Sequence, residues 1–268
     1  MMEQSYRKNL EQKYFMPLFI LIMTANLIEC YIIMFKHRFK NKFEYQLVSL
    51  SIADFITGLF GFIFSVIDAT KAELNEKILF GLQYILVFSI AMSIFLISGI
   101  SIDRLIAVAK PFNHQSSRNT IYIITSLWVF GLLYITSLMI INEYFLEQAT
   151  VATNTIVLSS ATVVSIVCYT LIYFSLWYHK RKLLKQTEPC TKNIIFGRNS
   201  NKMALRMSVI IILSTLLTYW PGVIISFGKI LYKCSTPTVE IFSNFTFFLA
   251  CSASLINPLV YFFYKKFI

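Results

Sequence analysis

Seven long apolar segments are the feature that most limits what this chain can fold into. They cover about residues 14–35, 45–69, 78–109, 120–141, 150–177, 203–228 and 238–264. Each is long enough to cross a bilayer as a helix, because about 20 apolar residues span the hydrocarbon core. None alternates apolar and polar residues as the strands of a membrane barrel do. We therefore expect an all-α membrane protein, built as a bundle of seven transmembrane helices.

Composition supports this reading and excludes several others. Of the 268 residues, 57% are apolar and 14% are charged, whereas a soluble domain is about 45–50% apolar and about 25% charged. The loops are too short for a separate soluble catalytic domain. The net charge of +11 is explained by basic loops facing anionic lipid, so we expect no nucleic-acid partner.

The distribution of positive charge predicts the orientation. With the N-terminus outside, most of the 24 Lys and Arg residues lie on the cytoplasmic side, many of them in a basic loop near 179–202. Positive residues favour that side, so we predict an extracellular N-terminus and a cytoplasmic C-terminus, in the plasma membrane. Residues 1–13 would form a short extracellular N-terminus and 14–264 the membrane domain. Residues 265–268 would start a cytoplasmic helix with little or no tail.

Two acidic residues fall inside predicted spans. Asp54 lies about ten residues into the second segment, and Glu29 lies in the first. A carboxylate at mid-bilayer costs about 2.5–3.5 kcal/mol, and such groups usually have a function. The simpler alternative is a protonated acid that hydrogen-bonds within the bundle. Glu29 is either protonated or part of a polar network with Asp54.

Three further positions carry chemistry. Asp103 and Arg104 close the third segment, where they are either functional or a solvated helix end. Pro221 in the sixth segment and Pro258 in the seventh each remove a backbone hydrogen bond and tend to kink a helix. These kinks serve either packing or hinge motion.

Together, the order and spacing of these residues resemble the rhodopsin-like (class A) G-protein-coupled receptors, from about residue 14 to the end. The resemblance rests on Asn26, Leu50-xxx-Asp54, Asp103-Arg104-Leu105, Trp128, Tyr169, Tyr219-Trp220-Pro221 and Asn257-Pro258-Leu259-Val260-Tyr261. The last of these is the family's NPxxY motif, and it stands in the proper segment.

The resemblance implies which residues switch the receptor. Arg104 would contact a heterotrimeric G protein on activation, and Asp103 would restrain it at rest. The other members of this group would be Tyr169, Tyr261, Asn257, Pro258 and Pro221. An allosteric sodium ion, the one cofactor implied, would bind Asp54, Ser93, Ser254 and Asn257, because a carboxylate with neutral oxygens suits a hard cation.

The resemblance also places an extracellular ligand among the outer halves of the helices. Its lining would include Gln83, Leu86, Val87, Ile90, Tyr219, Ser226 and Phe247. Leu86 replaces the acid with which amine receptors pair their ligand, and the seventh segment has no Lys for a retinal Schiff base. Amines and retinal are therefore disfavoured, and a lipid, a hydrophobic small molecule or a short peptide is favoured.

The sequence departs from the family pattern at several points. The Trp expected above the sixth-segment proline is one place late, and Ala161 replaces the fifth-segment proline. No extracellular cysteine pair is available. Residues 200–207 contain no acid to hold Arg104, which predicts some basal activity.

Two other functions were weighed against a receptor. A transporter or channel would use Glu29 and Asp54 as relay acids across the membrane. A membrane enzyme would need a cluster of His or acidic residues at the membrane edge. The three His residues, His37, His114 and His179, are scattered over predicted loops, so we expect no catalytic site.

Overall fold

The computed structural model describes the backbone of residues 2–37, 39, 42–70, 72, 74–109, 117–144, 147–185, 194–232 and 236–265. Its helices are α1 (Met2–Tyr31), the π-helical turn η1 (Ile32–His37), α2 (Lys42–Thr70), α3 (Glu76–Ala109), α4 (Ser117–Tyr144), α5 (Glu147–Lys185), α6 (Ile194–Tyr232) and α7 (Pro237–Lys265). Within these residues seven helices are long and apolar enough to cross a membrane, and there is no strand. The predicted all-α bundle of seven spans is confirmed.

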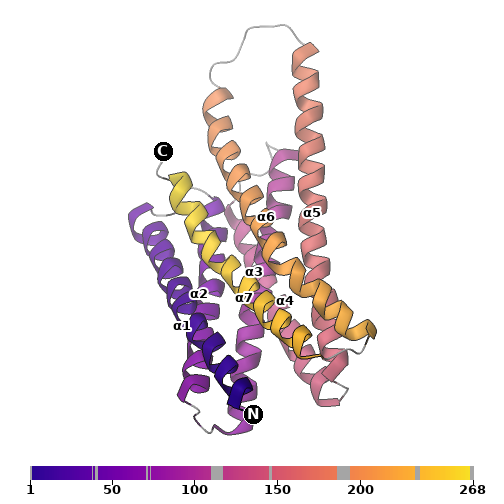
Figure 1. The fold of residues 1–268 in the computed structure, drawn as a ribbon. Helices are drawn as coiled ribbons and strands as arrows, with labels where there is room; N and C mark the ends of the chain where they lie inside the picture. Colours follow the sequence, from indigo (N-terminus) through magenta and orange to yellow (C-terminus); the bar gives the residue numbers. More distant parts are fainter. Residues whose placement is uncertain are drawn as a thin grey trace.

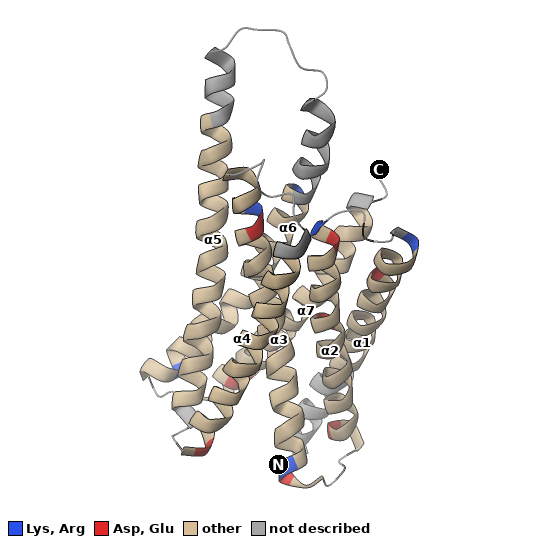
Figure 2. Cartoon of the chain, turned by 180° about the vertical axis from the view of Figure 1, so that it is seen from behind, with Lys and Arg blue, Asp and Glu red and all other residues tan. Residues whose placement is uncertain are grey.

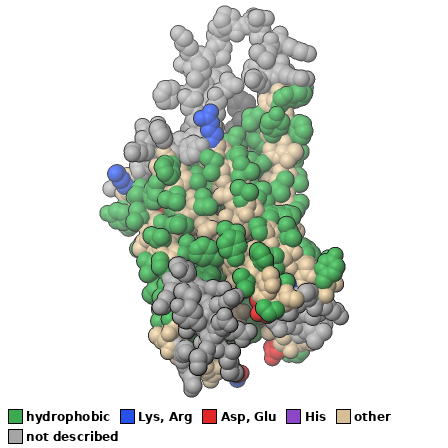
Figure 3. Space-filling view, in the orientation of Figure 1, with side chains coloured by type: hydrophobic (Ala, Val, Ile, Leu, Met, Phe, Trp, Pro, Cys, Tyr) green, Lys and Arg blue, Asp and Glu red, His purple; other side chains and the backbone are tan. Residues whose placement is uncertain are grey.

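The helices lie side by side, and the chain begins and ends at opposite ends of the bundle (Figure 1). Charged residues gather toward the two ends, while the middle is almost entirely uncharged (Figure 2). On the face seen in Figure 3, hydrophobic side chains cover most of the surface between those ends. This is the surface that a helix bundle presents to lipid.

Helix α3 forms the centre of the bundle. In its most apolar stretch 72% of residues are buried, against 17% in α4, and every residue from 91 to 101 is buried. The main apolar core forms around this segment and includes Met92, Phe95 and Ile100. Polar groups in this segment of α3 are therefore shielded from both lipid and water.

Helices α1 and α2 cross closely at a glycine. A methyl group added at Gly58 would lie 2.8 Å from the backbone nitrogen of Met23 and 3.0 Å from the carbonyl oxygen of Phe19. Small residues at helix crossings allow this approach in membranes, where packing rather than hydrophobicity joins helices. The crossing holds α1 against the part of α2 that carries Asp54.

The helix limits differ from the predicted segments mainly at three ends. Helix α1 begins at Met2, so most of the residues predicted to precede the membrane domain continue this helix. Helix α5 ends at Lys185 and helix α6 begins at Ile194, so much of the predicted loop near 179–202 is helical. The hydrophobic pattern stops where lipid contact stops, whereas helical hydrogen bonds continue into water.

Candidate functional site

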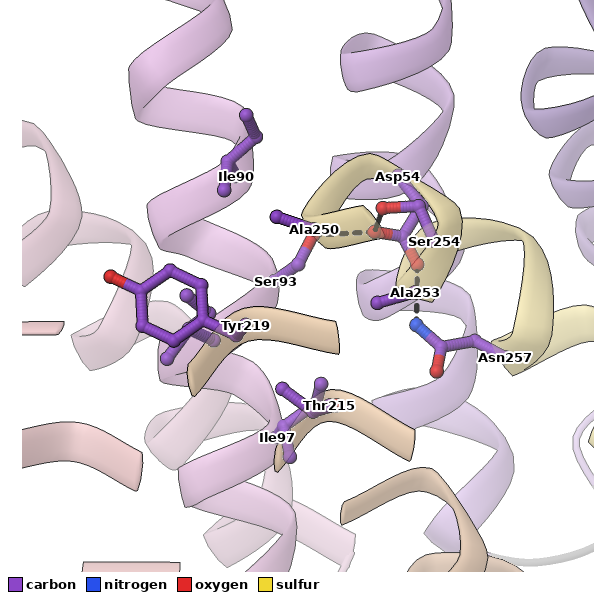
Figure 4. A pocket seen from close by; sticks show the side chains of 11 residues that line it. Asp54, Ile90, Ser93, Ile97, Thr215, Tyr219, Ala250, Ala253, Ser254 and Asn257 are labelled. Atoms are coloured by element: carbon purple, nitrogen blue, oxygen red, sulfur yellow. Dashed lines mark hydrogen bonds between the residues drawn. The ribbon is translucent and has the colours of Figure 1, made fainter. Parts of the chain in front are cut away.

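Asp54 lies at the centre of a buried cluster that joins three helices. Its side chain has no exposed surface. The Ser93 hydroxyl donates to Oδ1 from α3 at 2.6 Å, and the Ser254 hydroxyl donates to the same oxygen from α7 at 2.7 Å. The Asn257 amide nitrogen donates to Oδ2 at 2.7 Å. Figure 4 shows these side chains pointing at one another, so the structure brings together the four residues of the expected cation site.

A small cavity opens beside this cluster. It is lined by Asp54, Ile90, Ser93, Ile94, Ile97, Thr215, Tyr219, Ala250, Ala253, Ser254 and Asn257. The space within reach of the centre of a water molecule is about 20 Å³, and about 10–15 Å³ is enough for one water. Tyr219, Ile97 and Thr215 lie across the cavity from Asp54 (Figure 4). The cavity is thus the size of an ion or a water, not of an organic ligand.

The groups around the cavity fit a hard cation. They supply one carboxylate and two hydroxyl oxygens, and oxygen is the ligand that hard cations prefer. The buried Oδ1 of Asn257 has no hydrogen-bond partner in the described part of the chain. A buried acceptor that lacks a partner costs about 1–3 kcal/mol, and a bound cation would remove that cost.

A layer of further polar contacts extends from Asp54 across the bundle. The Asn26 amide donates to the Ser254 carbonyl at 3.0 Å, which ties α1 to α7. Thr57 donates to Ser89 at 2.9 Å, and the Trp128 indole donates to Ser49 at 2.9 Å. Asn26, Ser254 and Trp128 were singled out from the sequence, but Thr57, Ser89 and Ser49 were not. Thr57 lies three residues after Asp54 and Ser89 four residues before Ser93, so helical spacing was the signal available.

Glu29, the second acid within the membrane, belongs to a different group. It is 1% exposed, and the Ser51 hydroxyl donates to its Oε2 at 2.8 Å. Asp54 instead accepts from Ser93, Ser254 and Asn257. The hydrogen bonds described for the two carboxylates therefore come from different side chains.

Arg104 lies near the end of α3, at the end of the bundle where the chain finishes. Its Nη2 is 2.6 Å from Oδ2 of Asp103, and the two residues are 7% and 0% exposed. The guanidinium carbon lies 5.1 Å from the centre of the Phe43 ring. The Arg104 Nε is buried and has no hydrogen-bond partner in the described residues. The pair is thus enclosed by protein rather than solvated.

Two tyrosines expected to support Arg104 lie at the same end of the bundle. Tyr261 on α7 is 4% exposed, and the hydroxyl of Tyr169 on α5 is buried. Arg104 is close enough to Tyr169 to act on it electrostatically. The hydrogen bond described for Arg104 goes to Asp103, and its guanidinium lies over the Phe43 ring. The structure thus places Tyr169 near Arg104 and Tyr261 at the same end of the bundle.

Comparison with known families decides what this arrangement belongs to. The sequence model of the 7 transmembrane receptor (rhodopsin family) matches residues 25–261, which is most of the chain. The chain belongs to the rhodopsin family of seven-transmembrane receptors. A search of curated proteins found no match.

The residues expected to contact a ligand differ in their exposure. Ile90 and Tyr219 line the cavity beside Asp54. Leu86 is buried, Val87 and Ser226 are half-buried, and Gln83 is exposed. Phe247 is exposed on α7, where its ring lies 6.5 Å from that of Phe15. The expected ligand pocket stays a prediction, with Ile90 and Tyr219 reaching the cavity beside Asp54.

The receptor replaces the fifth-helix proline with a polar contact. Ser98 of α3 donates to the carbonyl of Ala161 at 2.7 Å, and Ser165 donates to the Ser98 hydroxyl at 3.2 Å. These bonds fix α5 against α3 where the family usually has proline. Pro221 and Pro258 lie inside α6 and α7, as expected.

The described cysteines Cys30, Cys168 and Cys251 are free. Cys190 and Cys234 lie outside the described residues. No group of three or more His, Cys, Asp or Glu able to hold a metal occurs among the residues searched, which are those described.

Proposed function

We propose that this receptor binds an extracellular ligand and activates heterotrimeric G proteins by opening its cytoplasmic end. The observation that carries the proposal is the buried Asp103–Arg104 pair at one end of a bundle whose centre is polar. An ion pair with an unbonded buried nitrogen gains little by staying closed. A partner that offers acceptors to Arg104 in an open bundle therefore shifts the equilibrium toward that state.

The prolines provide the route by which the bundle opens. Pro221 and Pro258 each leave one backbone carbonyl without its helical donor, so α6 and α7 bend there at lower cost than elsewhere. Tyr219 lies two residues before Pro221 and borders the cavity, and Asn257 precedes Pro258 and bonds Asp54. A ligand that moves the outer half of α6 would change both contacts, which couples the two ends.

We propose that Asp54, Ser93, Ser254 and Asn257 hold a sodium ion in the closed receptor. A cation would supply positive charge beside the buried carboxylate, and the residues would provide its oxygen ligands. Sodium binding can be tested through the thermal stability of the receptor. Replacing choline chloride with sodium chloride should raise its melting temperature. Asp54→Asn should remove that difference, while Glu29→Gln, the matched change at the other buried acid, should keep it.

The sequence pattern favours a lipid, a hydrophobic small molecule or a short peptide as the ligand, and the plasma membrane as the location. The positive charge bias supports an extracellular N-terminus. A transporter or channel that relays protons through Glu29 and Asp54 is the alternative. It is less well supported, because the two acids accept hydrogen bonds from different side chains.

The experiment that tests the proposal is nucleotide exchange by purified receptor and purified G proteins. The intact receptor should accelerate GTP exchange on at least one G-protein class, and Arg104→Ala should abolish the acceleration. Lys36→Ala, an exposed cation at the same end, should leave it intact. The transporter would be favoured if the receptor accelerates exchange on no G-protein class and if liposomes show an ion or solute flux that Asp54→Asn removes.

A further inference from the structure

Phe43 is the second residue of α2 and lies against Arg104. Its side chain is 6% exposed and joins the main core. Its ring centre is 5.1 Å from the guanidinium carbon, within the roughly 6 Å over which an aromatic face attracts a cation. Guanidinium stacks on aromatic faces readily because it is planar and weakly hydrated.

The contact matters because Arg104 has few other partners. A guanidinium has about five N–H donors, but the hydrogen bond found for Arg104 is the one from Nη2 to Asp103. Its Nε is buried without a partner in the described residues. Asp103 is its neighbour on α3, so this ion pair does not tie α3 to another helix. Among the contacts of the described residues, the Phe43 ring links Arg104 to a different helix.

The cytoplasmic start of α6 offers no replacement for this contact. Residues 200–207 contain no Asp or Glu, so an ion pair between Arg104 and this part of α6 is chemically impossible. Lys42, next to Phe43, lies near enough to Asp103 and Arg104 to interact with both charges. It attracts Asp103 and repels Arg104, so Lys42 does not account for the approach of α2 to Arg104, whereas the Phe43 ring lies against the guanidinium.

We propose that Phe43 is the positioning residue that restrains Arg104 in the closed receptor, and that the strength of this cation–π contact sets the basal activity. The inference rests on the proposed G-protein coupling and names the element that regulates it. Opening moves the guanidinium off the ring and frees it for the partner. A stronger aromatic face keeps the receptor quieter, and a weaker face makes it more active without ligand.

Fluorination of the ring separates this role from simple packing. Phenylalanine at position 43 is replaced with its mono-, di- and trifluorinated forms, which weaken the electrostatic face with little change in size. Basal GTP exchange should rise stepwise along the series and end roughly three- to thirtyfold higher, as expected for loss of a partly to fully desolvated cation–π contact. Phe43→Leu should match the trifluorinated ring, and Phe43→Trp, which has the strongest face, should restore low basal exchange.

Tyr45 supplies the matched control. It lies two residues further along α2, and its ring stacks on Phe39 at 4.4 Å rather than on Arg104. Tyr45→Leu should leave basal exchange unchanged. Equal basal exchange across the fluorinated series, in receptors that couple normally, would overturn the proposal.

A second signal distinguishes failure of this inference from failure of the proposed function. The ¹⁹F resonance of monofluorinated Phe43 should shift when Arg104 becomes Gln, because the charge above the ring is removed, and this needs no G protein. If the receptor never catalyses exchange but the resonance shifts, the proposed G-protein coupling is contradicted and the contact between Phe43 and Arg104 is supported. A resonance unaffected by Arg104→Gln overturns the contact itself, whatever the receptor couples to.

Discussion

The buried centre around Asp54 and the Arg104 end of the bundle hold a buried ionisable side chain in different ways. Both enclose an ionisable side chain in a low-dielectric interior. Asp54 accepts three hydrogen bonds from side chains on two other helices. Arg104 has one bond to its own neighbour and one aromatic contact with α2. The centre is therefore specified by many contacts, whereas the end is held by few and can be released.

This difference indicates how a membrane receptor divides stability from switching. Local opening is easiest where few contacts must be broken. Loss of a contact in the centre should therefore reduce the stability of the whole bundle. Loss of a contact at the Arg104 end should change the population of the open state and cost little stability.

The largest loss of stability should come from removing the Asp54 carboxylate. Asp54→Ala leaves the donors of Ser93, Ser254 and Asn257 without their acceptor, and each buried orphan costs about 1–3 kcal/mol. We expect a loss of roughly 3 kcal/mol or more in the free energy of unfolding, measured by thermal or denaturant unfolding in detergent. Phe43→Leu, at the other end, should raise basal exchange and cost less stability. The reverse ranking would refute the division described above.

A smaller loss should follow when the α1–α2 crossing beside the centre is forced apart. In Gly58→Ala the new methyl group meets the Met23 backbone at 2.8 Å, and overpacking of this kind costs about 1–3 kcal/mol. Gly81→Ala is the matched control, since no atom lies within 4 Å of the added methyl there. Equal melting temperatures for the two variants would show that the crossing is looser than the structure indicates.

Removing one donor from the centre should cost less again. Ser254→Ala deletes a 2.7 Å bond to the carboxylate, and a hydrogen bond to a charged group contributes about 1.5–3 kcal/mol. We expect a loss near the lower figure, because two other donors remain. Ser252→Ala is the comparison on the same helix, since Ser252 bonds only the carbonyl of Leu249 within α7 in the described structure. The two variants should differ in melting temperature, and identical values would contradict the contact.

The smallest effect should appear at the bond between α3 and α5. Ser98→Ala removes the hydrogen bond to the Ala161 carbonyl, and such contacts between membrane helices average about 0.6 kcal/mol. Ser160→Ala, whose hydroxyl bonds within α5, should be nearly neutral. A loss as large as that of Asp54→Ala would mean that the α3–α5 contact, and not the Asp54 cluster, specifies the bundle.

The sequence predicted the spans well because lipid imposes a simple requirement on them, about 20 apolar residues per crossing. It also grouped Asp54, Ser93, Ser254 and Asn257, since acids and amides in apolar segments stand out and the family motifs fix their register. The polar partners Thr57, Ser89 and Ser49 were missed. Ser and Thr in helices commonly bond their own preceding turn, so their presence alone does not reveal which of them reach another helix.

Two other features could not be read from the pattern. Phe43 is one of 25 Phe residues, and only the relative rotation of α2 and α3 shows that its ring meets Arg104. The π-helical turn Ile32–His37 follows an apolar stretch whose composition does not differ from that of an α-helix.

The most direct test of the account is the distance between the ends of α4 and α6 in the membrane. Spin labels at the exposed positions Ile121 and Arg206 report this distance with and without a nucleotide-free G protein. The account predicts a shift to longer distances when the G protein binds, and a smaller shift in Arg104→Ala. A distance distribution that G protein leaves unchanged in the intact receptor would contradict the claim that this bundle signals by opening at the Arg104 end.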